Sequence, residues 1–137
     1  MKRKFLMLAC LLQLGCGMLW AQNLTIEVRG IEQVEGKLMV AIFSSAENFL
    51  KKPVAAFAVE VKEKTLSIPC KGLPAGTYAI SLFQDVNGNS VLDTGTYGIP
   101  TEKYGFSNDA EVVMGPPTYE KACFSFSADK TVVIHLR

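Results

Sequence analysis

Leu24-Thr25-Ile26-Glu27-Val28-Arg29 alternates apolar and polar side chains without a break. Successive side chains of a β-strand point to opposite faces, so this period of two predicts a strand with one buried face. Similar apolar runs recur along the chain with turn residues between them. We therefore predict seven short strands, at about 24–29, 38–43, 57–61, 66–68, 77–83, 124–126 and 131–136.

This series of strands predicts a single all-β domain, an Ig-like or transthyretin-like β-sandwich. A small β-barrel is the alternative architecture. One segment departs from the strand pattern, because Ser44-Ser45-Ala46-Glu47 matches a capping box. It predicts either a short helix through Lys51, ended by Pro53, or a capped loop.

The N-terminus has the three-part layout of a secretory signal. Residues 2–4 are basic, an apolar run follows, and the small residue Ala21 ends it. We expect residues 1–21 to be a signal peptide cleaved after Ala21, and 22–137 to be an exported periplasmic or extracellular domain with no membrane span. The less favoured alternative is a lipoprotein attached through Cys16, because Gln13 lies where an aliphatic residue is usual.

Composition narrows the classes of function. The formal net charge is +1, and Lys and Arg are spread along the chain, so no basic patch indicates a nucleic-acid partner. The single histidine, His135, has no Ser or Cys partner at a recognisable spacing, and no zinc-type cluster is present. We interpret His135 as a solvated strand residue and expect a protein without enzymatic activity.

The segment from Asp85 to Asp93 could hold a metal ion. Side-chain oxygens fall at Asp85, Asn87, Asn89 and Asp93, and the Val91 carbonyl falls where an EF-hand loop uses a backbone oxygen. Oxygen donors around a tight loop suit Ca²⁺, so we expect Ca²⁺ as the cofactor. An alternative needs no metal, because Asn87-Gly88 is also a common two-residue hairpin turn.

Three motifs in combination resemble the DUF2141 family of bacterial secreted proteins. They are Leu73-Pro74-Ala75-Gly76-Thr77-Tyr78-Ala79, then Asp85-x-Asn87-Gly88-Asn89 with Asp93, then the run from Gly98-Ile99-Pro100 to Ser107-Asn108, continued by 115–122. The resemblance covers essentially all of 22–137 and implies a β-sandwich, but no assigned activity. Where that family often has His before the first Asp, this chain has Gln84.

Residues 98–108 are rich in Gly, Pro and aromatic residues. Glu102, Tyr104 and Asn108 could present polar groups as a binding loop beside the ion loop. The alternative, which we favour, is a packed Ω-loop that covers the sandwich edge.

Cys70 and Cys123 form an even pair in an exported domain, which favours a disulfide. The strand phase points Cys70 inward and Cys123 outward, which disfavours one, so we leave the pairing open.

These observations favour an exported, non-enzymatic β-sandwich module, Ca²⁺-stabilised, that binds an envelope protein or a glycan. A metal-dependent hydrolase using Asp85, Asp93 and Glu102, and a purely structural envelope protein, are the alternatives.

Overall fold

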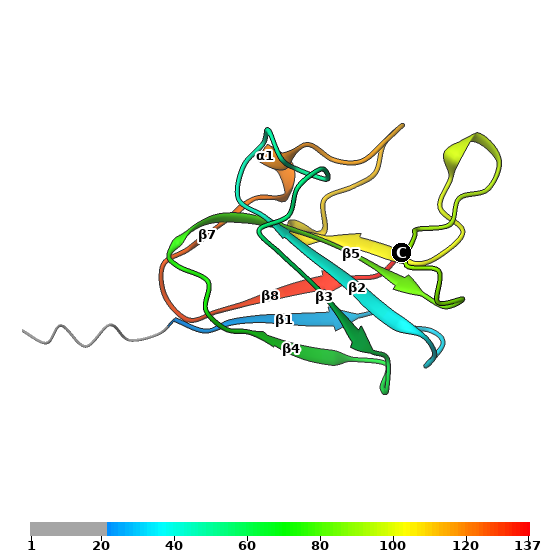
Figure 1. Ribbon diagram of the computed structural model, residues 1–137, viewed down its shortest axis with the longest axis horizontal. Helices are drawn as coiled ribbons and strands as arrows, with labels where there is room; N and C mark the ends of the chain where they lie inside the picture. The colour runs from blue at the N-terminus through cyan, green and yellow to red at the C-terminus, as the bar shows by residue number, and fades with distance from the viewer. Residues whose placement is uncertain (1–21) are drawn as a thin grey trace, which may run out of the picture.

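The computed structural model describes residues 22–137, so the expected signal segment lies outside the described residues. The chain is mostly strand, with one short α-helix and two 3₁₀ turns (Figure 1). In chain order the elements are β1 (Leu24–Arg29), β2 (Lys37–Phe43), β3 (Ala55–Glu60), β4 (Leu66–Cys70), β5 (Gly76–Asp85), η1 (Thr96–Gly98), β6 (Tyr104–Phe106), η2 (Ser107–Asp109), α1 (Tyr119–Ala122), β7 (Phe124–Phe126) and β8 (Lys130–His135).

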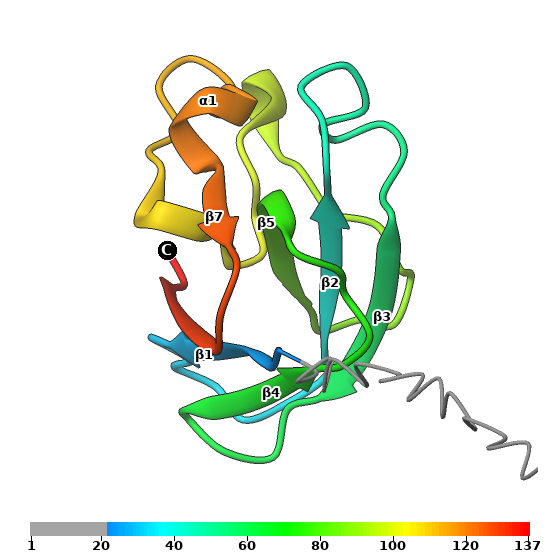
Figure 2. The ribbon, with the colours of Figure 1, turned by 90° about the vertical axis from the view of Figure 1, so that its left-hand side faces the viewer.

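The strands form two sheets. One has the order β4-β1-β8, and the other has the order β3-β2-β5-β6, with β7 also pairing with β5. In Figure 2, β1 and β4 run horizontally while β2 and β3 run vertically, and in Figure 1 β2 and β3 pass obliquely over β1 and β8, so the strands of the two sheets are not aligned. The predicted all-β sandwich is confirmed, with eight strands instead of about seven.

The buried faces of the two sheets make the main core. Leu24, Ile26 and Val28 of β1 are fully buried, as their alternation predicted. They pack with the inward residues of β2, β5 and β8 in one cluster. A second, smaller cluster lies on the outer side of the larger sheet, where Phe43, Phe49 and Phe106 meet α1.

Of the two alternatives expected after Ser44 the structure shows the capped loop, and one strand, β6, was not predicted. The segment after Ser44 is a turn, in which the Ser45 hydroxyl accepts a hydrogen bond from the Asn48 N–H at 3.3 Å. A helix does not continue there because Phe49 is drawn into the second cluster and Leu50 takes a left-handed backbone, with φ of 60°. Strand β6 was not predicted, because it is three residues long with a central glycine.

Candidate functional site

The Asp85–Asp93 loop begins where β5 ends. Asp85 is the last residue of that strand and is buried, with 3% of its surface exposed. Its carboxylate accepts hydrogen bonds from the Gly88 N–H at 3.1 Å and the Ser90 N–H at 2.8 Å. The loop is therefore wrapped around the carboxylate of Asp85, which is satisfied by backbone donors.

Asn87 and Asn89 repeat one local bond two residues apart. The Oδ1 atom of Asn87 accepts from the Asn89 N–H at 3.2 Å, and that of Asn89 accepts from the Val91 N–H at 3.1 Å. Their amide nitrogens contact the Asp93 carboxylate, at 2.5 Å from Asn87 and 2.6 Å from Asn89. Three of the five predicted ligands thus converge on one point, and Asp85 and Val91 belong to the same network.

Glu102 closes the loop at its base. One carboxylate oxygen accepts from the Asp93 N–H at 3.0 Å, and the other accepts from the Val86 N–H at 2.9 Å. Because both oxygens are bonded to the backbone, Glu102 ties the beginning of the loop to its end. The sequence had suggested a ligand-binding carboxylate here, and this clamping role has no local sequence signal.

The base of the loop is also held from the β1–β2 connection. Gln84 is buried, and its amide nitrogen donates to the carbonyls of Gln33 and Glu35, both at 2.8 Å. Gly36 lies so close that an added Cβ would be 2.2 Å from the Asp85 carbonyl oxygen. Gln84 therefore positions the strand end that carries Asp85.

The donor set suits a hard cation. Carboxylate and amide oxygens are the ligands that Ca²⁺ takes in proteins. Within residues 22–137, no group of three or more His, Cys, Asp or Glu side chains could hold a metal ion, so Asp85, Asp93 and Glu102 do not form one. Any cation at this loop would depend on the asparagine side chains and backbone carbonyls.

Beyond Asp93 the chain forms a projecting hairpin. Thr94 bridges to Pro100, the Gly95 N–H bonds the Ile99 carbonyl at 2.7 Å, and η1 makes the tip. At that tip Tyr97 is 96% exposed.

The two other predicted binding residues make bonds within the protein. The backbone of Tyr104 exchanges hydrogen bonds with Arg137, at 3.2 Å and 2.9 Å, and its ring packs edge-on against Phe106. The Asn108 amide donates to the carbonyls of Lys121 and Cys123, at 3.1 Å and 2.8 Å, and so caps the end of α1. The structure gives both residues a role in holding the segment against the sandwich.

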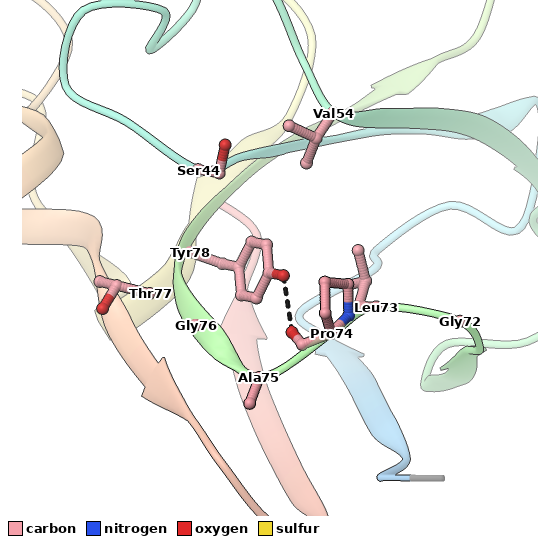
Figure 3. A pocket seen from close by; sticks show the side chains of 9 residues that line it. All are labelled: Ser44, Val54, Gly72, Leu73, Pro74, Ala75, Gly76, Thr77 and Tyr78. Atoms are coloured by element: carbon pink, nitrogen blue, oxygen red, sulfur yellow. Dashed lines mark hydrogen bonds between the residues drawn. The ribbon is translucent and has the colours of Figure 1, made fainter.

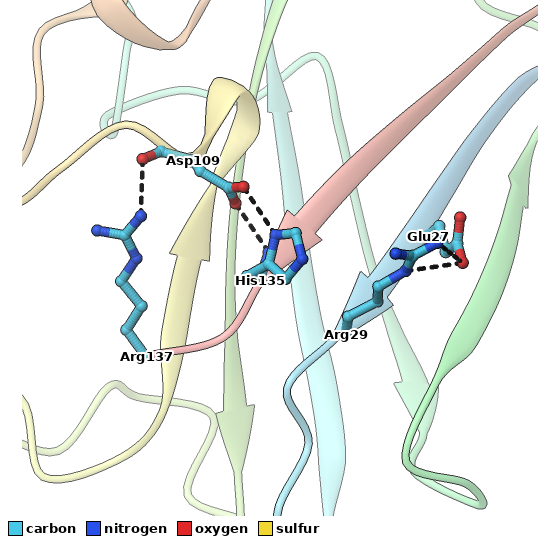
Figure 4. A network of polar contacts seen from close by, with 5 residues as sticks. All are labelled: Glu27, Arg29, Asp109, His135 and Arg137. Atoms are coloured by element: carbon cyan, nitrogen blue, oxygen red, sulfur yellow. Dashed lines mark hydrogen bonds and ion pairs between the residues drawn. The ribbon is translucent and has the colours of Figure 1, made fainter.

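His135 is not simply a solvated strand residue. Its Nδ1 lies 2.7 Å from an Asp109 carboxylate oxygen, and its backbone N–H donates to the other at 2.8 Å (Figure 4). Arg137 donates to the Asp109 carbonyl at 3.1 Å. This group attaches η2 to the end of β8, and sequence reasoning missed it because the residues are far apart in the chain.

An open hollow of about 510 Å³ lies beside the start of β5 (Figure 3). Ser44, Val54 and residues 72–78 line it, and the Tyr78 hydroxyl donates to the Pro74 carbonyl at 2.6 Å. Ser44, Thr77 and Tyr78 bring hydroxyl groups to the lining, which includes no carboxylate, histidine or cysteine that could act as a general base beside them.

Cys70 and Cys123 are both free thiols. Cys70 belongs to the main core, whereas Cys123 packs with the second cluster on the other side of the larger sheet. The strand alternation predicted that Cys70 points inward and Cys123 outward, and this placement agrees with it. Burial raises the pKa of the Cys70 thiol above its ordinary value.

Comparison with known proteins adds one match. A family model described as an uncharacterized protein conserved in bacteria, DUF2141, matches residues 26–134. No curated protein and no solved structure matches the chain.

Proposed function

Since the chain belongs to the DUF2141 family, we propose that it is an exported, non-enzymatic β-sandwich module of the cell envelope whose Asp85–Asp93 loop binds Ca²⁺. The family carries no assigned activity, so the proposal rests on the geometry of the loop. The observation that carries it is the convergence of Asn87, Asn89 and Asp93.

The loop has the hydrogen-bond pattern that oxygen-rich cation loops need. The carboxylate at the first position and the amides at the third and fifth positions each accept a backbone N–H from further along the loop. This wrapping turns side chains at alternate positions toward a common centre. A two-residue hairpin turn at Asn87-Gly88 without a metal would not require Asp93 to lie beside Asn87 and Asn89.

Binding requires a small rearrangement of the two amides. The oxygen and nitrogen of an Asn amide are nearly equal in size, so a half-turn about its terminal torsion exchanges their positions. That rotation would present the oxygens of Asn87 and Asn89 to a cation beside the Asp93 carboxylate. It would also give up the bonds that these oxygens accept from the Asn89 and Val91 N–H groups, and the bonds to the cation would replace them. The Asp85 carboxylate and the Val91 carbonyl would complete the set, and the cation would offset the repulsion between the two acids.

The expected partner is an envelope protein or a glycan. Support for export is the three-part N-terminal pattern, and N-terminal sequencing of the released protein should begin at Gln22. Within residues 22–137, no helix is long and apolar enough to cross a membrane.

The Ca²⁺ proposal is tested by thermal melting and calorimetry. Extracellular sites of this type bind with a Kd of ~10⁻⁴ to 10⁻³ M. Ten millimolar Ca²⁺, ~10 to 100 times that Kd, should then raise the free energy of unfolding by about 1.4 to 2.7 kcal/mol.

The matched variants are Asp93→Asn, which keeps the side-chain shape but removes the charge, and Glu111→Gln, an exposed control elsewhere. Asp93→Asn should lose the Ca²⁺-dependent shift, and Glu111→Gln should keep it. Equal melting temperatures of the unsubstituted protein in Ca²⁺ and in chelator, with no heat of binding, would show that the loop is only an Asx-rich turn.

A further inference from the structure

Large apolar side chains stand in solvent at the tips of separate loops. Tyr97 is 96% exposed and Ile99 64% on the hairpin tip, while Val113 is 70% and Met114 106% exposed on the loop before α1. Single exposed apolar residues are ordinary, but two such residues together on each of two loop tips are less so. Leu50, 40% exposed, adds a third site in the loop between β2 and β3.

Three residues at these tips have a left-handed backbone conformation that bulky side chains rarely adopt. Leu50, Tyr97 and Met114 have φ of 60°, 61° and 56°. This left-handed region suits glycine and asparagine, and it is unusual for a bulky side chain. Since Tyr97 and Met114 are 96% and 106% exposed, these two side chains make little contact with the protein, and the fold itself gives no reason for their size. Strain of this kind at exposed apolar residues points to a function outside the domain.

The three loops share one flat end of the molecule. Figures 1 and 2 share a vertical axis, and both place the turquoise loop 44–54, the yellow-green tip 96–98 and the gold-orange loop 112–117 at the top. The rest of the described domain lies below them. A plane laid on that end would touch all three loops together.

The loops are held from beneath by the second cluster. Phe49 is buried against Phe43 and Tyr119, next to Leu50, and Val112 packs on the same cluster, next to Val113. The hairpin is held by its own bridge and by the Glu102 clamp. The exposed tips are therefore set on a packed base, and little ordering is required when they bind.

We propose that this end docks onto the surface of a lipid bilayer, with Tyr97, Ile99, Val113 and Met114 inserted to the depth of the headgroups. Separated apolar tips on one plane suit a fluid surface, which fills the spaces between them, better than a protein partner, which needs a continuous complementary patch. Tyrosine is also a residue type enriched where hydrocarbon meets water.

The charged side chains at this end indicate which lipid headgroups it would bind. Lys51 and Lys52 follow Leu50 in the turquoise loop, but Glu47 lies in the same loop and Glu111 beside the gold-orange one, all of them exposed. Positive and negative groups nearly balance, so attraction to anionic headgroups is weak. We therefore expect binding to zwitterionic phosphatidylethanolamine–phosphatidylcholine vesicles, increased only modestly by phosphatidylglycerol.

The test is flotation with vesicles of these compositions, using the protein as the bacterium releases it, with the N-terminus of each preparation determined. Tyr97→Ser with Ile99→Ser, and Val113→Ser with Met114→Ser, should each lower the partition coefficient by about ten-fold or more. The control, Val34→Ser, removes an exposed apolar side chain from the connection between β1 and β2. It should bind as the unsubstituted protein does.

Two further variants distinguish a loss of lipid contact from a loss of folding stability. Tyr97→Gly with Met114→Gly relieves the left-handed backbone, so it should melt no lower than the unsubstituted protein while losing flotation. Tyr97→Trp, in the released protein that begins at Gln22, should show fluorescence quenched by brominated acyl chains, whereas Val34→Trp should not.

Several results would overturn the proposal. One is the absence of flotation at millimolar lipid, and another is equal flotation of the Ser and Gly tip variants and the unsubstituted protein. Quenching of Val34→Trp as strong as that of Tyr97→Trp would also overturn it. If the tips instead drive self-association in sedimentation without binding vesicles, the surface is a protein interface.

Discussion

Replacing Ser107 by alanine should be among the most damaging single changes in this domain. Ser107 is fully buried at the start of η2. Its hydroxyl accepts from the Ile80 N–H at 2.8 Å and donates to the Ala122 carbonyl at 2.5 Å. One hydroxyl therefore joins β5, η2 and α1.

The expected loss follows from those two bonds. Alanine leaves a buried N–H and a buried carbonyl without their partner, and each such group costs about 1 to 3 kcal/mol. We expect the free energy of unfolding to fall by about 2 to 6 kcal/mol, a large fraction of the stability of a domain this size. Urea unfolding followed by far-UV circular dichroism would show this as a lower midpoint with an unchanged slope.

Ser125→Ala is the matched control, because Ser125 is exposed on β7 and its hydroxyl makes no hydrogen bond within residues 22–137. Its free energy of unfolding should stay within about 0.5 kcal/mol of the unsubstituted protein. If Ser107→Ala proved no less stable than Ser125→Ala, the hydroxyl would not join these elements as the geometry indicates.

Three further predictions follow from other contacts. Gly36→Ala should destabilise far more than Gly88→Ala in the same urea assay, since both have positive φ but only Gly36 would place a Cβ 2.2 Å from the Asp85 carbonyl; equal losses would contradict this. Iodoacetamide at pH 8 should alkylate Cys123 before Cys70, because burial raises the pKa of Cys70 and leaves less thiolate; mass spectrometry reads the order. Burial also raises the pKa of Tyr78, so its contribution to stability is complete below pH 10 and is lost as pH rises through the folded-state pKa; Tyr78→Phe should flatten that decline in thermal melts.

The strands were predictable because their signal is local. Leu24 to Arg29 show their buried face in their own alternation, and the structure buries that face. Strand β2 was predictable as a continuous apolar run, and it lies between β3 and β5. The family motifs identified the same domain over its whole length. What local pattern could not supply was pairing between distant segments, such as the contact between Asp109 and His135.

The Asp85–Asp93 loop was likewise predictable from local pattern only in part. Its donors at alternate positions were visible in the sequence, and the structure brings Asn87, Asn89 and Asp93 together. The clamp by Glu102 could not be predicted, because a carboxylate that accepts two backbone N–H groups has no residue pattern of its own. Strand β6 was missed for a related reason, since Gly105 is needed where Ile134 and His135 pack closely on it.

The position of β1 in the smaller sheet constrains when the protein can fold. β1 lies between β4 and β8, and Leu24 pairs in parallel with Lys130. The first strand of the domain therefore lacks one neighbour until almost the last residue has been synthesised. Pairings this distant in sequence make for slow folding, over roughly milliseconds to seconds. For the export proposed above, such late closure would leave the chain unfolded until β8 is available to pair with β1.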